Sequence, residues 1–357
     1  MNYKETLFFI GLCLTISHEK ENKLLVEKQL QKGNINWDNI VKVSTAHYVF
    51  PALFCNLKRV GFLQYLPKDL VEYMEYITSL NRDRNEQILT QAKEITQILL
   101  RENITPIYLK GTSNLLSGLY QDIGERMVGD IDFLVSKEHA DQAFNILKKN
   151  GYQNKTTKVF DDARHLPRLT NKDRIAAVEI HEEMLHKDFA KNFSYQHIQD
   201  TILQKNGDSF LSLENQLALT IFSKQLNDHG QHFFDIALKN SYDIFLLSLK
   251  VNSLDAIAKY DVLFHPANNY LACSAIALSS KNIIHNSTIE SQTYTLEFLD
   301  RLQNTEENKS KRKKTNQKLF FKDRLSIIKN AFTNKKIRNW LLQRITSKAW
   351  LKEKLKR

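Results

Sequence analysis

Two aspartates stand one residue apart at the start of an apolar stretch, in Asp130-Ile131-Asp132-Phe133-Leu134-Val135. The stretch is short and rich in β-branched and aromatic residues, which predicts a strand at 131–135. Side chains alternate along a strand, so Asp130 and Asp132 lie on one face. Two carboxylates this close repel, and bound Mg²⁺ or Mn²⁺ removes the conflict. For these two residues alone, the alternative is a solvated strand end.

A third carboxylate occurs in a second apolar stretch, Val178-Glu179-Ile180-His181. Glu179 and His181 share one face of the predicted strand, while Val178 and Ile180 pack behind. A carboxylate between buried neighbours needs an ionic partner or a cation, because burying an unpaired charge is costly. Glu179 is therefore a candidate third metal ligand. The alternative is an ordinary edge-strand glutamate.

The third carboxylate lies on a predicted hairpin, with strands at 165–170 and 174–181 and a turn at 171–173. Pro167 places the first strand at a sheet edge, because proline cannot donate to a ladder. The hairpin brings His165 and His181 near the carboxylate face. There they either contact ligands or substrate, or only pack.

A possible anion-binding turn precedes the aspartates. The pattern at 104–109 predicts a strand that leads into Lys110-Gly111-Thr112-Ser113 and then a helix at 114–120. Glycine and hydroxyl residues at a helix start expose backbone N–H groups to phosphate, and Lys110 adds a positive charge. The spacing is not that of a P-loop, and a plain turn is the alternative. Arg126 either clamps a phosphate or pairs with Glu125 or Asp122.

The remaining chain predicts helices on both sides of this region. Apolar residues recur at helical spacing before residue 98 and again from about 188, and a helix at 137–150 ends before Gly151. Asp243 lies on one of the later helices, as either a substrate contact or a pairing residue. We predict an α+β protein with an N-terminal helical domain (1–98), a core with a small mixed β-sheet (99–190), a C-terminal helical domain (191–303) and a basic linker and tail (304–357).

The positive charge is concentrated at the C-terminal end. Residues 309–357 contain 18 Lys and Arg but only two acids, a local charge of +16, whereas the whole chain carries +11. The first 308 residues therefore carry about −5. Aromatic and aliphatic residues alternate with the basic ones, a pattern typical of helices that bind an anionic membrane surface and of segments that bind nucleic acid. A partly packed terminal helix is the third interpretation.

Cysteine usage and hydropathy favour the cytoplasm. The three cysteines lie far apart without a CxxC pair, which excludes a zinc framework or an even disulfide set. The apolar run at 7–16 has Glu5 before it and no small-residue cleavage site after it, so we expect a core helix rather than a signal peptide. We expect a cytoplasmic protein, peripheral at the membrane if the tail binds lipid.

These motifs together resemble a bacterial family of uncharacterised nucleotidyltransferases within the polymerase-β-like superfamily. The resemblance covers about residues 100–185 and rests on Tyr108-Leu109-Lys110-Gly111, Leu119-Tyr120, Gly124, Arg126, Asp130-Ile131-Asp132-Phe133-Leu134-Val135, His165 and Val178-Glu179-Ile180-His181. Here Gly111 is followed by Thr112-Ser113 and lies 19 residues before Asp130, which departs from the common pattern.

The resemblance implies roles for these residues. Asp130, Asp132 and Glu179 would hold Mg²⁺ or Mn²⁺, and Glu179 would also deprotonate an acceptor hydroxyl. Gly111 and its neighbours would hold the β- and γ-phosphates of a nucleoside triphosphate. The implied activity is transfer of a nucleoside monophosphate to an unidentified hydroxyl or phosphate acceptor, with two metal ions and release of pyrophosphate.

Two other functions fit the same motifs. One is a DxD-type glycosyltransferase that binds Mn²⁺ and a nucleotide-sugar, which would require a larger parallel sheet before Asp130. The other is a non-catalytic binding module that keeps the nucleotidyltransferase fold. The nature of the acceptor is not encoded in any recognisable motif, because acceptor specificity depends on pocket shape.

Overall fold

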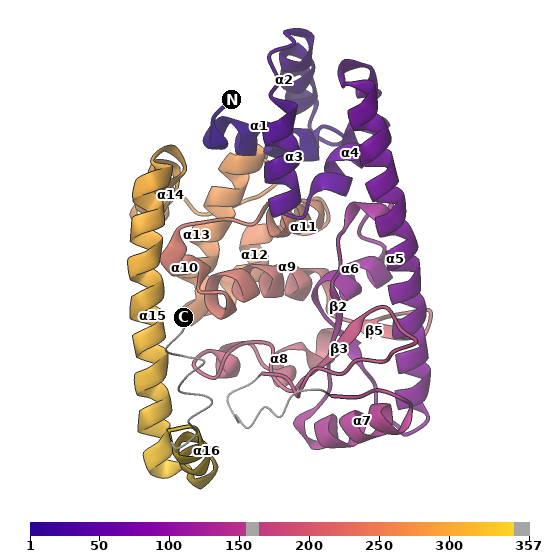
Figure 1. Cartoon of the computed structure of the whole chain (residues 1–357), viewed down its shortest axis with the longest axis vertical. Helices are drawn as coiled ribbons and strands as arrows, with labels where there is room; N and C mark the ends of the chain where they lie inside the picture. The colour runs from indigo at the N-terminus through magenta and orange to yellow at the C-terminus, as the bar shows by residue number, and fades with distance from the viewer. Residues whose placement is uncertain (155–163, 346–357) are drawn as a thin grey trace.

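A bundle of helices forms the N-terminal part of the chain. The computed structural model describes residues 1–154 and 164–345. Five α-helices and one 3₁₀ turn precede the first strand: α1 (Tyr3–Thr15), α2 (Lys20–Gln31), α3 (Trp37–Ala46), α4 (Phe50–Arg59), η1 (Leu63–Tyr65) and α5 (Lys68–Leu100). Helix α5 has 33 residues and runs along one side of the molecule, beside the sheet (Figure 1).

One five-stranded mixed sheet follows, in the order β3-β2-β1-β5-β4. The central pair β1–β2 and the edge pair β5–β4 are antiparallel, whereas β2–β3 and β1–β5 are parallel. The strands are β1 (Ile107–Tyr108), β2 (Asp130–Leu134), β3 (Ala177–His181), β4 (Leu203–Lys205) and β5 (Asp208–Phe210). A small mixed sheet with flanking helices confirms the predicted α+β class.

The structure differs from the sequence interpretation around this sheet. The sequence predicts only helices from about 188 onward, but β4 and β5 form a hairpin that extends the sheet at its β1 edge. All three residues of β4 are exposed and β4 is short, so no apolar alternation marks it. Helix α6 (Lys110–Ser117) begins four residues before the predicted start, while α7 (Lys137–Lys149) agrees with the prediction.

The predicted hairpin, whose second strand contains β3, is present. His165 and Leu169 pair antiparallel with His181 and Val178 as single bridges, and the Leu169 and Val178 backbones exchange hydrogen bonds of 2.9 and 2.8 Å. Pro167 lies between the two bridges, where a missing N–H interrupts the ladder. The stretch that contains Pro167 is therefore at the sheet edge, as predicted.

Helix α5 fixes the backbone that leads into β2 and β3 through amide side chains. Asn81 and Asn85 each donate to two carbonyl groups in the segment before β2, those of Ile123 or Gly124 and of Arg126, at 2.6–3.1 Å. Gln91 donates to the Ala176 carbonyl at 2.9 Å and accepts from the Ala176 N–H at 3.0 Å. Since Ala176 directly precedes β3, one helix positions the entry into both strands.

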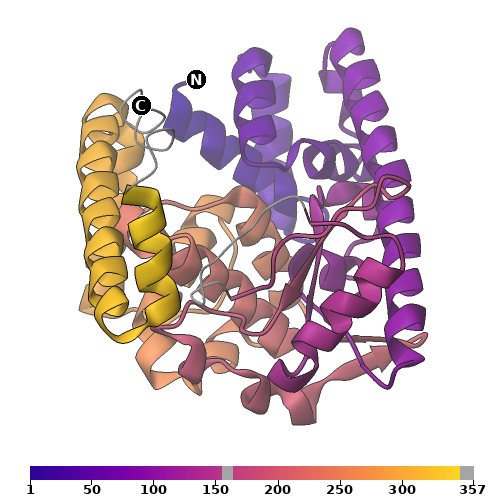
Figure 2. The same ribbon diagram turned by 60° about the horizontal axis from the view of Figure 1, so that its bottom comes forward.

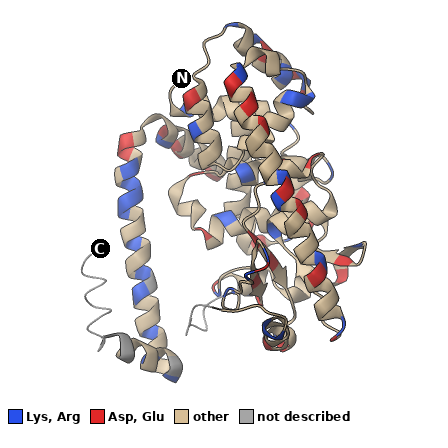
Figure 3. Ribbon diagram, turned by 45° about the vertical axis from the view of Figure 1, so that its right-hand side comes forward, with Lys and Arg blue, Asp and Glu red and all other residues tan. Residues whose placement is uncertain are grey.

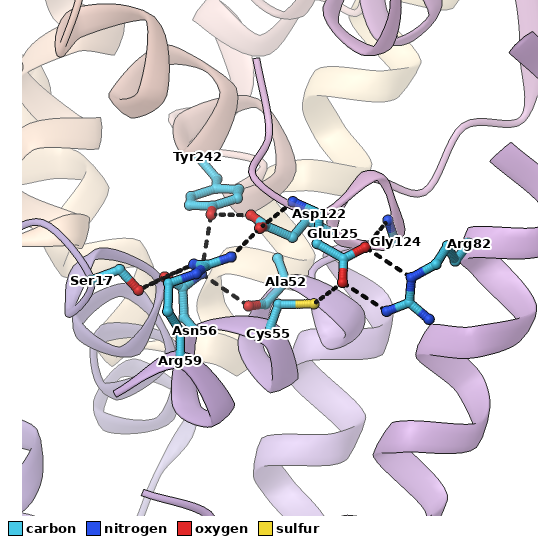
Figure 4. A network of polar contacts seen from close by, with 10 residues as sticks. All are labelled: Ser17, Ala52, Cys55, Asn56, Arg59, Arg82, Asp122, Gly124, Glu125 and Tyr242. Atoms are coloured by element: carbon cyan, nitrogen blue, oxygen red, sulfur yellow. Dashed lines mark hydrogen bonds and ion pairs between the residues drawn. The ribbon is translucent and has the colours of Figure 1, made fainter. Parts of the chain in front are cut away.

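An ionic network around Glu125 and Asp122 also anchors this segment (Figure 4). The turn η2 (Ile123–Glu125) contains Glu125, whose side chain is 1% exposed and accepts from Arg59 of α4 and from the Tyr242 hydroxyl, both at 2.5 Å. Asp122 accepts from Arg82 Nε at 3.0 Å and Arg82 NH2 at 2.7 Å. Burial favours neutral Asp122, but the hydrogen bonds from Arg82 and Gly124 outweigh it and lower the pKa of Asp122.

Helix α8 (Tyr195–Ile198) lies between β3 and β4 in the chain, and the remaining helices follow β5: α9 (Leu213–Phe222), α10 (Gly230–Phe233), α11 (Leu238–Ser248), α12 (Ser253–Ala258), α13 (Asp261–Leu278), α14 (Ile289–Gln303), α15 (Thr305–Thr333) and α16 (Lys335–Ile345). Helix α1 packs against α13, and Asn22 donates to the Leu278 carbonyl at 3.0 Å. The helices before and after the sheet therefore pack on one another, and α15 lies on the opposite side of the molecule from α5 (Figure 2).

The stretch interpreted as a linker from its polar composition, 304–318, lies almost entirely in α15. It contains no glycine or proline, and Glu306 and Glu307 occupy the first helical turn, where acidic side chains favour a helix. No helix in the described part of the chain combines the length and hydropathy that crossing a bilayer requires.

We predict that Arg59→Met destabilises the protein by about 3 kcal/mol, because it leaves the buried charge of Glu125 without its ionic partner. The control is Lys58→Met. Lys58 pairs with Glu75, but both side chains are more than half exposed, so its loss is expected to cost less than about 1 kcal/mol. Urea unfolding of both variants at pH 7 measures the difference, and equal destabilisation would contradict the anchoring role of Glu125.

Candidate functional site

Strand register brings the three predicted carboxylates together. Asp132 of β2 lies directly opposite Glu179 of the parallel strand β3, and Asp130 lies two residues earlier on the same face. The Asp132 side chain is buried, whereas the Asp130 side chain is 32% exposed. The acidic cluster therefore reaches from the sheet interior to the surface.

Two cations neutralise this cluster. Lys110 Nζ lies 2.6 Å from Asp132 Oδ1. Arg168, on the edge stretch beside β3, contacts Asp130 Oδ2 at 2.5 Å through NH2 and Glu179 Oε1 at 3.3 Å through Nε. Three carboxylates thus share two full positive charges.

Both histidines that the sequence analysis placed near the carboxylates, His165 and His181, lie at the acidic cluster. His181 is fully buried, its Nε2 lies 2.7 Å from Asp132 Oδ1 and its Nδ1 lies 3.3 Å from the Glu183 carbonyl oxygen. His165 Nε2 lies 3.6 Å from Glu179 Oε2. The two rings are 5.3 Å apart, so they line the carboxylate face rather than pack elsewhere.

Burial and neighbouring charge set the protonation of the cluster. Burial and the charges of Asp132 and Glu179 raise the pKa of Asp130. Burial also favours neutral Asp132, but the charge of Lys110 and the hydrogen bond with His181 outweigh it, and the pKa of Asp132 lies well below its usual range. Burial lowers the pKa of His181, which favours the neutral imidazole that metals bind.

The donor set fits a divalent metal ion. Asp132, Glu179 and His181 each offer one ligand atom, and these atoms lie within 4.8 Å of one another. Carboxylate oxygens suit Mg²⁺ and Mn²⁺, while an imidazole nitrogen is more typical of Mn²⁺ and softer metals. This group contains His181 beside the predicted ligands Asp132 and Glu179, while the third predicted ligand, Asp130, pairs with Arg168, as Glu179 also does.

The predicted anion-binding turn forms the first turn of α6. Lys110 has a left-handed backbone with φ of 53°, a strained conformation for a residue other than glycine. A Cβ atom at Gly111 would lie 3.0 Å from Val128 Cγ2, so packing also favours glycine there. The side chains of Thr112 and Ser113 are buried, and Thr112 donates to the Asp130 carbonyl at 3.3 Å.

Arg126 is engaged by an acidic residue that sequence spacing did not identify. Its Nε lies 3.1 and 3.0 Å from the two carboxylate oxygens of Asp243 on α11, and both side chains are buried. The Tyr120 hydroxyl donates to the same carboxylate at 2.6 Å. Asp243 is therefore a pairing residue, and its partner is Arg126 rather than a residue of its own helix.

Arg168 is a site residue that the sequence interpretation missed. The bridge of Leu169 with Val178 places the preceding residue, Arg168, beside Glu179 on the carboxylate face. The alternation of the predicted hairpin contains this signal, because any residue next to Leu169 points to the opposite face. A basic residue there could have been read as the counter-charge of the acidic cluster.

Comparison with known proteins assigns the chain to a family. Residues 33–260 match the family described as uncharacterised nucleotidyltransferase. The chain belongs to this family. The match covers the sheet, the acidic cluster and the helices that hold them, which confirms the resemblance inferred from the sequence motifs.

Two solved structures from Helicobacter pylori are similar to this chain. One, described as a candidate nucleotidyltransferase, is 16% identical with a TM-score of 0.30, and the match covers 63% of this chain and 92% of that one. The other, JHP933, is 14% identical with a TM-score of 0.30, and the match covers 67% and 97%. No curated protein matches the chain.

We predict that Arg168→Met increases the affinity for Mn²⁺ by roughly fivefold, equivalent to about 1 kcal/mol, because Arg168 competes with the metal for Asp130 and Glu179. Calorimetric titration without nucleotide measures the affinity. Arg174→Met is the control, since Arg174 lies on the same hairpin but pairs with Glu94 of α5, and its removal is expected to leave Mn²⁺ binding unchanged. Weaker Mn²⁺ binding by Arg168→Met would show that Arg168 does not compete with the metal.

Proposed function

We propose that the protein transfers a nucleoside monophosphate from a nucleoside triphosphate to a hydroxyl or phosphate acceptor. An acceptor oxygen forms a bond to the α-phosphorus, the bond to the bridging oxygen of the β-phosphate breaks, and pyrophosphate leaves. The observation that carries the proposal is the alignment of Asp132 with Glu179 on adjacent strands of a nucleotidyltransferase-family chain.

Asp130, Asp132 and Glu179 hold the divalent metal in this proposal, and His181 adds a nitrogen ligand within reach. When bound, Mg²⁺ or Mn²⁺ neutralises phosphate charge and makes the acceptor oxygen a better nucleophile. Glu179 accepts the acceptor's proton on Oε2, which lies 3.6 Å from His165 Nε2, because Oε1 is the oxygen that forms the ion pair with Arg168. Positioning and charge neutralisation account for most of the catalysis in such phosphoryl chemistry.

Lys110 and Arg168 change partners in this mechanism. In the structure they form ion pairs with the carboxylates, which would instead hold the divalent cation when it is bound. Both side chains are then free to bind phosphate oxygens, Arg168 through a planar fork and Lys110 as a point charge. The backbone N–H groups of Gly111 and Thr112, at the start of α6, add donors for the β- and γ-phosphates, whereas the Ser113 N–H already donates to the Leu109 carbonyl at 3.2 Å.

The rival glycosyltransferase interpretation fits less well. It requires a larger parallel nucleotide-binding sheet before Asp130, but the two-residue strand β1 is the only strand that precedes β2 in the described residues, and it pairs antiparallel with β2. A non-catalytic binding module keeps the same fold and is separated from the enzyme by the experiment below.

The proposal predicts metal-dependent binding of a nucleoside triphosphate that requires the acidic pair. Calorimetric titration of ATP, CTP, GTP and UTP with Mg²⁺ or Mn²⁺ is expected to identify at least one ligand, and Asp130→Ala/Asp132→Ala is expected to abolish its metal-dependent binding. Release of pyrophosphate in the presence of extracted cellular acceptors reports the reaction itself.

The matched control is Asp141→Ala, which removes an exposed carboxylate from α7, away from the cluster. This variant is expected to bind nucleotide like the wild type. Triphosphate binding that survives the double substitution would reject the proposed site, and binding without any turnover would favour the non-catalytic module.

We further propose that α15 attaches the protein to an anionic membrane surface. Four large apolar side chains recur at spacings of four, three and four residues and are 47–79% exposed: Phe321, Leu325, Ile328 and Phe332. This spacing places them in one stripe, with Lys322, Arg324 and Lys329 on its borders. Figure 3 shows the basic residues along this helix.

The borders of the stripe favour lipid over a second copy of the chain. Pairing two copies of α15 would bring like charges together on both sides of the apolar seam, which costs stability. Nucleic acid would satisfy the basic residues but leave the aliphatic stripe exposed. An anionic bilayer surface accommodates both the basic residues and the apolar stripe. Under this proposal the protein is cytoplasmic and lies at the membrane periphery.

The full chain is expected to sediment with phosphatidylserine-containing vesicles and to dissociate at high salt. Leu325→Ser/Phe332→Ser is expected to lose vesicle binding, while Leu24→Ser is the control, because Leu24 on α2 is 67% exposed and Leu325 is 66% exposed. Equal vesicle binding by all three proteins, or binding to single-stranded RNA alone, would reject the membrane assignment.

A further inference from the structure

A small basic cavity adjoins the acidic cluster. Its volume is about 160 Å³, and four cations line it with two acids and several polar residues, among them Ser223: Lys110, Arg126, Arg164 and Lys239 against Asp228 and Asp243. Lys110 belongs to both places, because its ammonium group contacts Asp132 while its side chain lines the cavity. The basic cavity therefore lies next to the carboxylates but draws most of its residues from the end of α9, the following turn and α11.

Two of the four cations in the basic cavity lack an ionic partner. Arg126 is neutralised by Asp243 and Lys110 by Asp132. Neither Arg164 nor Lys239 makes an ion pair with any residue in 1–154 or 164–345; the Lys239 ammonium instead lies 5.1 Å from the ring centre of Tyr48. Burial and the charge of Arg126 lower the pKa of Lys239 and outweigh the charges of Asp243 and Asp228, which raise it.

The basic cavity also contains hydrogen-bond donors that have no acceptor. Arg164 Nε and Ser223 Oγ are buried and have no hydrogen-bond partner among the residues that the structure describes. An unsatisfied buried donor costs about 1–3 kcal/mol, so two in one small cavity call for a ligand that accepts hydrogen bonds. The carbonyl oxygen of Arg164 accepts from the N–H groups of Glu182 and Glu183 at 3.0 and 3.1 Å, which fixes the backbone that carries this guanidinium.

We propose that the basic cavity is a subsite for a phosphate group, held by Lys239, Arg164 and Ser223. A phosphate offers several acceptor oxygens, and its negative charge complements the excess of Arg164 and Lys239 over Asp228 in the lining. The proposal rests on the proposed nucleotidyl transfer, since Lys110 links the subsite to the carboxylates. The phosphate belongs either to the triphosphate donor or to a phosphorylated acceptor, and the two sources predict different binding behaviour.

The test is calorimetric titration of the full chain with inorganic phosphate in the presence of EDTA. Lys239→Met and Ser223→Ala are each expected to weaken phosphate binding, at least tenfold for Lys239→Met, whereas Lys239→Arg retains it. The control is Lys259→Met, because Lys259 also lies 5.1 Å from a tyrosine ring centre, that of Tyr260, but does not line the basic cavity. Thermal unfolding confirms that each variant is folded.

Competition identifies the source of the phosphate. If the subsite serves the donor, phosphate competes with the triphosphate and Lys239→Met weakens both ligands. If it serves the acceptor, phosphate binds alongside the triphosphate, and Lys239→Met weakens phosphate alone. An adventitious ion only, bound equally by the wild type, Lys239→Met and Ser223→Ala, or no phosphate binding to the wild type, would overturn the proposal.

The EDTA titration separates this proposal from the proposed function. Phosphate binding without metal does not require the acidic cluster to hold Mg²⁺. Loss of metal-dependent triphosphate binding in Asp130→Ala/Asp132→Ala, together with unchanged phosphate binding in Lys239→Met, would support nucleotidyl transfer and reject the subsite. Unchanged triphosphate binding in Asp130→Ala/Asp132→Ala, together with weakened phosphate binding in Lys239→Met, would support an anion subsite in a protein without the proposed activity.

Discussion

The mutual repulsion of three carboxylates on adjacent strands is the constraint around which the structure is organised. Asp130, Asp132 and Glu179 share one face only because β2 and β3 are parallel with Asp132 opposite Glu179. A register shift of one residue would turn Glu179 to the opposite face. Lys110 and Arg168 neutralise the cluster, and the buried His181 fixes the orientation of Asp132. The same arrangement can exchange its cations for a metal ion and its substrate.

The helices hold this register from two directions. Asn81, Asn85 and Gln91 on α5 hydrogen-bond to the backbone before β2 and β3, so a single rigid element aligns both strands. The buried Glu125 and the Arg126–Asp243 pair connect the same segment to α4 and α11. Some charged residues near the site, such as Arg126 and Asp243, therefore position the strands rather than bind a ligand.

Local patterns in the sequence predicted the centre of the site but not its surroundings. Alternation within 130–135 and 178–181 was enough to place Asp132, Glu179 and His181 on one face, because strand geometry is periodic. The β4–β5 hairpin and the Arg126–Asp243 pair depend on contacts between residues distant in sequence, which no local pattern encodes. The basic cavity escaped prediction for the same reason, since Lys239 and Arg164 meet only after α11 packs beside the sheet.

The most direct test of the account is a crystal structure of the protein with Mn²⁺ and a non-hydrolysable nucleoside triphosphate, in which anomalous scattering locates the metal. The account predicts Mn²⁺ bound by Asp132 and Glu179, with Lys110 and Arg168 moved from the carboxylates to phosphate oxygens. Bound nucleotide with Lys110 still paired to Asp132 and no Mn²⁺ at the carboxylates would contradict it.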